Sequence, residues 1–150
     1  MLSKQEHIAY WVKSAEDDWE AVNALLTSKK YVQCLFFAHL VLEKLCKSHW
    51  VKDNEGNTPP KTHNLVRLIR LTDFEINEDD LQFLEEFNDF QLEGRYPDYL
   101  FEIHKRCDLS YTQKHLERVK ILIMYAVIYC AGYLLCRLFF CNHNQTSDNE

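Results

Sequence analysis

The stretch from Tyr31 to Trp50 is the feature that most constrains the fold. It contains neither Gly nor Pro, and it is long enough for about five turns of helix. Its apolar residues recur at three- and four-residue intervals: Leu35, Ala38, Leu42 and Leu45. Further apolar residues widen this face: Phe36, Phe37, Leu40 and Val41. A helix that is apolar on most of its circumference has to be covered on most of its sides, so the pattern predicts a central helix.

Length and composition favour one helical domain. A chain of 150 residues can bury a continuous core and rarely builds two. Three Gly and three Pro are too few for the frequent turns of an all-β protein, so we predict an all-α fold. The net charge of −6 argues against a general binder of phosphate backbones, although it leaves room for a local basic site.

Capping signals place the helices on either side of the central one. Ser3 and Glu6 form a capping box for a first helix, which runs to about Leu26. The connection Thr27–Lys30 is short, so the first two helices should be antiparallel neighbours. After a polar loop at Lys52–Lys61, Thr62 is expected to cap a short third helix.

Capping and turn residues in the second half of the chain predict two more helices. Asn77 is expected to cap a fourth helix, and Gly94–Asp108 is expected to be an irregular connection. Ser110, with Gln113, should begin a last helix that continues to Phe140. We assign residues 1–141 to the bundle and 142–150 to a disordered polar tail.

The uncharged stretch Ile121–Cys136 raises the question of a membrane span. Its sixteen residues would cover about 24 Å at ~1.5 Å per residue, short of the ~30 Å hydrocarbon core. Tyr125, Tyr129 and Tyr133 also bring three hydroxyl groups to one face. We therefore expect a buried or dimerising helix and no membrane association.

The six cysteines do not form a metal-binding pattern. They lack a CxxC pair or regular Cys/His spacing, so we expect no metal site and no cofactor. No secretory leader is evident, so we expect reduced thiols in a cytoplasmic protein. The cysteines are Cys34, Cys46, Cys107, Cys130, Cys136 and Cys141.

Four segments, in order, resemble the HEPN domain family. They are Ala15–Ala21, Phe36–Lys47, Thr62–Leu65 and Arg95–Asp98, and the resemblance extends over about residues 5–140. It implies an antiparallel up-and-down bundle of four or five helices, usually a homodimer. HEPN proteins are often paired with a minimal nucleotidyltransferase as toxin and antitoxin; others are metal-independent ribonucleases, and some bind nucleotides without catalysis.

The leading hypothesis from this resemblance is a nucleotide- or RNA-binding partner of a nucleotidyltransferase, in a toxin–antitoxin type pair. An alternative is a metal-independent endoribonuclease. The ribonuclease members have an Arg followed, after four to six residues, by a His. Arg95 fits the Arg position, but eight residues separate it from His104, the candidate partner. Arg137 and His143 match the spacing near the end of the last helix, which we interpret as accidental. A third possibility is a structural dimer without a ligand.

The nucleotide-binding candidates surround the same segment. They are Arg95, Tyr96, Asp98, Lys44, Lys47 and His63. Each has a plainer interpretation. Arg95 and Asp98 could form a salt bridge that holds the loop, Tyr96 could pack or accept a nucleotidyl group, and His63 could be structural. Glu43, Lys44 and Lys47 would ordinarily form a solvated helix face, and His39 would be a core or interface histidine.

Overall fold

The computed structural model describes residues 1–93 and 96–131, which form helices and no strand. The helices are α1 (Lys4–Thr27), α2 (Tyr31–Asp53), α3 (Leu65–Ile69), α4 (Glu78–Glu93), α5 (Pro97–Arg106) and α6 (Leu109–Ala131). This confirms the predicted all-α fold. The predicted extension of the last helix to Phe140, with Tyr133, and the tail at 142–150 lie outside the described residues.

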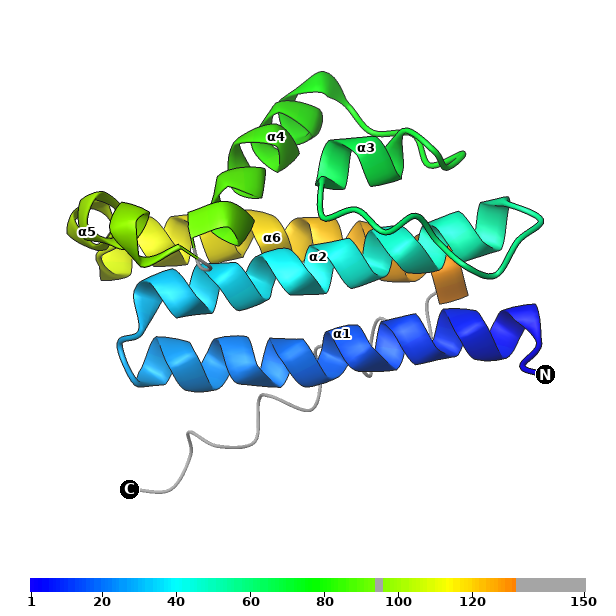
Figure 1. Ribbon diagram of the computed structural model, residues 1–150, viewed down its shortest axis with the longest axis horizontal. Helices are drawn as coiled ribbons and strands as arrows, with labels where there is room; N and C mark the ends of the chain where they lie inside the picture. Colours follow the sequence, from blue (N-terminus) through cyan, green and yellow to red (C-terminus); the bar gives the residue numbers. More distant parts are fainter. Residues whose placement is uncertain (94–95, 132–150) are drawn as a thin grey trace.

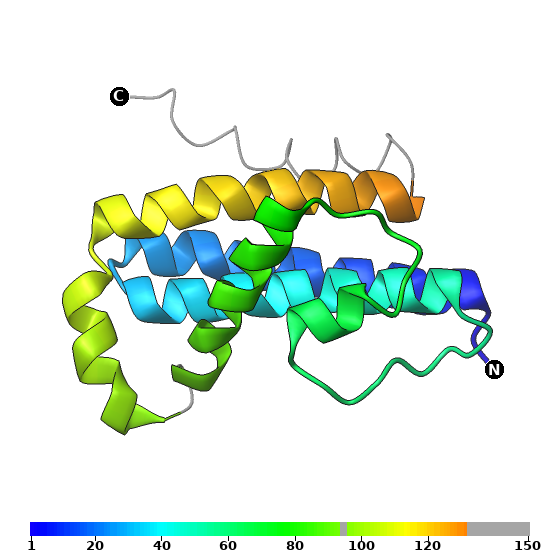
Figure 2. The same cartoon turned by 90° about the horizontal axis from the view of Figure 1, so that it is seen from above.

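Helix α2 is the centre of the bundle, as its sequence predicted. It contacts each of the other five helices. Figure 1 shows α1 and α6 running alongside α2, with α3 and α4 over its remaining side. Leu35, Ala38 and Val41 are fully buried. Figure 2 shows α4 crossing α2 obliquely, while α5 lies at the end of the bundle where α6 begins.

Helix α1 begins with the predicted capping box. The Ser3 hydroxyl accepts a hydrogen bond from the Glu6 backbone, and the Glu6 carboxylate accepts one from the Ser3 backbone at 2.7 Å. The short turn after Thr27 makes α1 and α2 antiparallel neighbours, as expected. Lys29 in this turn has φ 57°, in the left-handed region that favours glycine.

Two other caps differ from the prediction by two residues. Asn64, not Thr62, caps α3 by accepting a hydrogen bond from the Arg67 backbone at 2.8 Å. Asp108, not Ser110, caps α6 through the backbone of Tyr111, also at 2.8 Å. In both cases a short Asn or Asp side chain lies near the predicted hydroxyl and is at least as good a cap. Asn77 caps α4 as predicted, through the Asp80 backbone at 2.8 Å.

The predicted irregular connection at Gly94–Asp108 is wrong for most of its length. Pro97–Arg106 is helix α5, with Pro97 in its first turn and three basic residues in its last turn. Pro is favoured at the start of a helix because that position needs no backbone donor, and cations are favoured at the C-terminal end. Gly94 and Arg95 lie outside the described residues.

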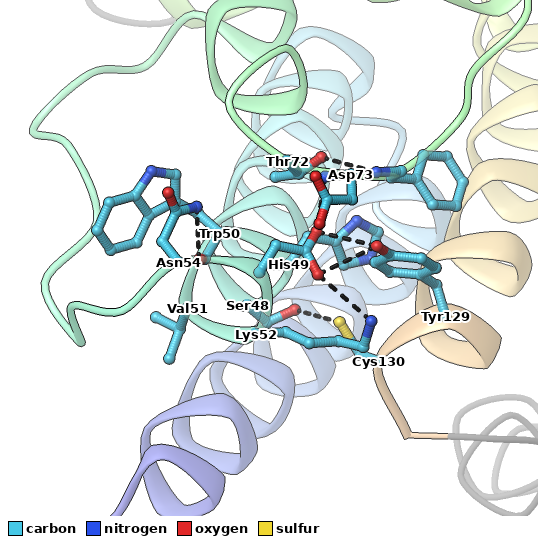
Figure 3. A network of polar contacts seen from close by, with 12 residues as sticks. Ser48, His49, Trp50, Val51, Lys52, Asn54, Thr72, Asp73, Tyr129 and Cys130 are labelled. Atoms are coloured by element: carbon cyan, nitrogen blue, oxygen red, sulfur yellow. Dashed lines mark hydrogen bonds and ion pairs between the residues drawn. The ribbon is translucent and has the colours of Figure 1, made fainter.

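A polar network fixes α6 against the C-terminal end of α2. Tyr129 donates its hydroxyl to the two carboxylate oxygens of Asp53, at 3.1 and 3.0 Å. Asp53 also accepts a hydrogen bond from the Asp73 backbone at 2.9 Å, and the Lys52 ammonium lies 3.7 Å from the Tyr129 ring centroid. Figure 3 shows Tyr129 turned toward the end of α2, beside His49 and Lys52. These polar groups satisfy one another, so the network is structural.

The described cysteines are free thiols packed mostly as small apolar groups. Cys34, Cys46 and Cys107 are buried, and Cys130 is partly buried. Burial raises the pKa of the Cys34 and Cys46 thiols to about 12, so both stay protonated. In the described part of the chain, no helix combines the length and the apolar character that crossing a bilayer requires.

Candidate functional site

A buried carboxylate on α2 organises part of the predicted site. Glu43 is only 5% exposed. Its Oε1 accepts a hydrogen bond from the Lys47 ammonium at 2.6 Å, one turn along the same helix. Its Oε2 lies 3.0 Å from Nδ1 of His63, in the segment before α3. The structure therefore brings together two of the predicted nucleotide-binding residues, Lys47 and His63, through an acidic residue between them.

These contacts keep Glu43 ionised. Burial by itself would raise the pKa of the Glu43 carboxyl, but the hydrogen bonds from Lys47 and His63 outweigh it and lower the pKa below its ordinary value. The prediction that Glu43 and Lys47 belong to a solvated face is wrong, because their side chains are only 6% and 12% exposed. The pair is instead a buried ion pair on the side of α2 that faces the α3 segment.

His39 lies one turn before Glu43 and is a core histidine. Its ring is completely buried, and Nδ1 is 4.0 Å from Glu43 Oε2. Burial lowers the pKa of His39 to about 4, although Glu43 and Asn88 act in the opposite direction. His39 is therefore neutral at pH 7. This confirms the core interpretation of His39.

Lys44 connects α2 to α1. Its ammonium lies 2.6 Å from Asp18 Oδ2 and donates a hydrogen bond to the Ser14 carbonyl at 3.3 Å. Lys47 also lies 5.3 Å from the ring centroid of Trp11. Both lysines are thus paired with carboxylates inside the protein. Their charges are already neutralised, which leaves little net positive charge here for a phosphate group.

The other predicted site residues lie on α5 or outside the described residues. Tyr96 is the N-cap residue of α5 and is 55% exposed. His104 is exposed in the last turn of α5, roughly 10 Å along the helix axis from Pro97. The expectation that His104 lies in a loop is therefore wrong. Arg95 and the side chain of Asp98 are outside the described residues.

A cavity that sequence reasoning missed lies between α4, α5 and α6. Its volume is about 220 Å³. Three phenylalanines of α4 line it, and all three are buried: Phe83, Phe87 and Phe90. Two rings of α6 complete the aromatic lining. Tyr111 and His115 are both partly buried, and their ring centroids are 4.1 Å apart. Aromatic side chains of two helices therefore form half of the cavity lining.

The polar residues of the cavity come from all three helices. Glu86 and Asp89 lie on α4, Arg106 ends α5, and all three are exposed. His115 Nδ1 is 2.8 Å from the Tyr111 carbonyl oxygen. A carbonyl can only accept, so Nδ1 donates this hydrogen bond, and Nε2 is the acceptor of the neutral ring. The site thus combines hydrogen-bond acceptors with one guanidinium group.

Phe87 connects the two parts of the site. Its ring is stacked with His39 at a centroid distance of 6.4 Å and an interplanar angle of 18°. It is also stacked with His115, at 6.4 Å and 22°. The ring of Phe87 thus contacts both the buried histidine of α2 and the half-buried histidine of the cavity. Among the described residues, no three His, Cys, Asp or Glu side chains gather into a potential metal site.

The sequence carried only part of the signal for this cavity. The sequence predicted the fourth helix, on which Phe87 and Phe90 lie. Arg106 and His115 were not singled out, because α5 was expected to be irregular and nothing then placed their side chains together. Recognising Pro97 as a helix start would have put Arg106 at the end of α5, close to the beginning of α6.

Comparison with known proteins identifies the family. The model of the HEPN domain family matches residues 8–128. That range includes α2 through α5 completely, and most of α1 and α6. No curated protein and no solved structure matches the chain.

Proposed function

Because this chain belongs to the HEPN domain family, we propose that it binds a nucleotide or an RNA end and works as the partner of a minimal nucleotidyltransferase. The pair would be of the toxin–antitoxin type. The observation that carries the proposal is the family match over residues 8–128, which covers most of the described bundle. Nucleotide and RNA chemistry is common in this family.

The charge distribution supports nucleotide binding. The chain has a net charge of −6, so a long polyanion would be repelled by most of its surface. The last turn of α5, however, is basic: Arg106 is exposed there, while Lys105 is already paired with Glu102 at 3.1 Å. A local basic site of this kind suits one or two phosphate groups better than an extended RNA backbone.

The partner enzyme is proposed to act near the start of α5. Tyr96 is 55% exposed, so a second protein can reach this residue. We include nucleotidylation of Tyr96 in the proposal, because its hydroxyl could accept a nucleotidyl group.

Homodimer formation also belongs to the proposal. Ile121, Tyr125 and Ile128 of α6 are 47%, 46% and 40% exposed, and a second copy would cover this apolar face.

The proposal is tested by mixing the purified protein with the nucleotidyltransferase encoded by a neighbouring gene. We expect a stable complex in size-exclusion chromatography, or mass spectrometry showing a nucleotidylated tyrosine that disappears in Tyr96→Phe. Neither result appearing would remove the partner from the proposal.

Nucleotide binding is tested separately by thermal unfolding of the protein alone. A nucleotide that binds the folded state raises the melting temperature. If no nucleotide or short RNA does so, the chain is better explained as a structural dimer. If RNA is cleaved in the presence of chelator, and Arg95→Ala and His104→Ala both abolish cleavage, the endoribonuclease alternative replaces the proposal.

A further inference from the structure

We propose that the cavity between α4, α5 and α6 binds one ribonucleoside monophosphate unit, either free or at the end of an RNA. The base would lie against the aromatic lining, its donor groups at Glu86 and Asp89, and its phosphate at Arg106. This inference rests on the proposed function, to which it adds a place and a ligand class. It moves the nucleotide site away from Lys44 and Lys47, whose charges are neutralised by Asp18 and Glu43.

The size of the cavity limits the number of bases that it can hold to one. Pockets for drug-sized ligands have volumes of roughly 300–1,000 Å³. This cavity, at about 220 Å³, is smaller. Tyr111 and His115 line the cavity and are only partly buried, so a ligand there can contact both side chains, while Phe87 forms part of the buried floor. Stacking of a base on aromatic side chains strengthens binding and tolerates any base.

The hydrogen-bonding groups require a ligand that donates. The carboxylates of Glu86 and Asp89 only accept hydrogen bonds when ionised, and Nε2 of a neutral His115 accepts as well. Amino groups of a base and the hydroxyls of a ribose are donors, so a ribonucleoside matches these groups. A purely apolar ring would fill the cavity but would leave the polar residues around it without a ligand partner.

Arg106 supplies the position for an anionic group. It lines the same cavity and its planar guanidinium matches two oxygens of a phosphate. Its neighbour Lys105 does not line the cavity and lies 3.1 Å from Glu102. Arg106 is therefore the cation of α5 that a ligand in the cavity would meet.

The charge balance favours one phosphate over three. Two carboxylates and one guanidinium give the polar residues of the cavity a net charge of about −1 when His115 is neutral. Additional phosphates would meet this negative charge without a second cation among the described lining residues. A monophosphate should therefore bind more tightly than the corresponding triphosphate.

An aromatic amino acid is the competing ligand. It also has a ring, a donor (its ammonium group) and an anion (its carboxylate). Membership of the HEPN family favours the nucleotide, and tryptophan is therefore included in the test. Calorimetry on the full chain would compare the four ribonucleoside 5′-monophosphates, their nucleosides and triphosphates, a 5′-phosphorylated oligoadenylate, and tryptophan.

Matched variants on α5 test the position of the phosphate. Arg106→Gln should weaken binding of the best monophosphate about tenfold, while binding of its nucleoside changes less than about twofold. The control Lys105→Gln removes the adjacent positive charge outside the cavity and should leave both affinities unchanged. Unchanged monophosphate binding in Arg106→Gln would overturn the placement of the phosphate.

Matched variants on α4 test the selection against triphosphates. Glu86→Gln should narrow the preference for the monophosphate over the triphosphate by roughly threefold, since it removes one screened charge near the phosphates. Glu85→Gln, at the neighbouring exposed position outside the cavity lining, should leave the preference as it is. An equal effect of the two variants would overturn the role of Glu86.

The position of the base is tested by His115→Phe. This variant keeps a flat ring of similar size and removes the acceptor Nε2, so nucleoside and monophosphate should both bind about tenfold more weakly. Thermal unfolding of each variant checks that it is folded.

The source of the nucleotide is tested by comparing AMP with a 5′-phosphorylated oligoadenylate. Tighter binding of the oligoadenylate would favour the RNA end, and equal binding would favour the free nucleotide.

Failure of the inference differs from failure of the proposed function. If the wild type binds nucleotides but the variants at Arg106, Glu86 and His115 all keep wild-type affinity, the cavity is not the site and the proposed function stands. If tryptophan binds and no nucleotide does, the ligand class is wrong. If no monophosphate or oligoadenylate binds, both the inference and the nucleotide-binding part of the proposed function fail.

Discussion

Tyr129 of α6 donates its hydroxyl to both carboxylate oxygens of Asp53, the last residue of α2, at 3.1 and 3.0 Å. Tyr129→Phe removes this contact and leaves Asp53 with fewer donors for its charge. We expect the free energy of unfolding to fall by about 1.5–3 kcal/mol, the usual range for a hydrogen bond to a charged group. Urea denaturation measures the loss.

Tyr10→Phe on α1 is the matched control. Tyr10 is 59% exposed, so the same loss of a hydroxyl should change the free energy of unfolding by less than ~0.5 kcal/mol. Equal stabilities for Tyr129→Phe and the wild type would show that the Asp53 contact contributes nothing net.

Stability should decrease as pH falls from about 6.5 to about 4. Burial lowers the pKa of both His39 and His49 to about 4, so the unfolded chain takes up protons in this range while the folded chain does not. The stability that depends on these two histidines is fully present above pH 6.5. Protonation of each histidine in the unfolded chain can lower the free energy of unfolding by up to ~3 kcal/mol at pH 4. Urea denaturation at pH 7, 6 and 5 follows the decrease.

The histidine responsible is identified with single variants. His49 donates a hydrogen bond through Nε2 to the Ala126 carbonyl at 2.9 Å, which a glutamine can replace. His49→Gln should therefore flatten the pH dependence between pH 7 and 5. His104→Gln, at an exposed position of α5, should leave it unchanged. A pH dependence that is the same in all three proteins would contradict the assignment.

Glu43→Gln should destabilise the protein by roughly 3 kcal/mol. The substitution leaves the Lys47 ammonium buried, at 12% exposure, without its ionised partner 2.6 Å away. Glu86→Gln on the exposed side of α4 makes the same chemical change and should cost less than ~0.5 kcal/mol. Thermal unfolding compares the two, and a similar melting temperature for both would mean that the buried pair adds little.

Lys29→Gly should stabilise the protein by about 1 kcal/mol. Lys29 has φ 57°, a conformation that costs a residue with a Cβ about 1–2 kcal/mol and costs glycine nothing. Part of that gain is lost to the greater freedom of glycine in the unfolded chain. Ser28→Gly, one residue earlier at φ −78°, receives only the entropic penalty and should destabilise. Opposite signs for these neighbouring variants in urea denaturation are the expected result.

The sequence was sufficient for the elements that local chemistry determines. The capping box at Ser3, the cap at Asn77 and the apolar circumference of α2 each depend on residues within a few positions of one another, and each appears in the structure. Helix α5 was not predicted, because glycine and proline, here Gly94 and Pro97, usually mark turns and helix ends. Pro97 instead lies in the first turn of the helix, where its missing donor costs nothing.

The candidate site could not be predicted to the same degree, because it depends on distant parts of the chain. Glu43 looked solvent-exposed in the sequence of α2, and only the position of His63, twenty residues later, completes its burial and its second hydrogen bond. The cavity required α5 as a helix before Arg106 and His115 could be placed on one surface. The proposed roles of Arg95 and Asp98 stay predictions.

Every other helix contacts α2, and this arrangement determines how the amides of α2 exchange with solvent. The central amides of α2 are covered from all sides, so they should exchange with solvent only when the whole molecule unfolds. Helix α5 is ten residues long and ends in three exposed basic residues. Its amides should therefore exchange through local opening, which requires less free energy than unfolding of the whole molecule. Helix α5 forms one wall of the cavity, so this wall can move to fit a bound ligand while the rest of the bundle stays rigid.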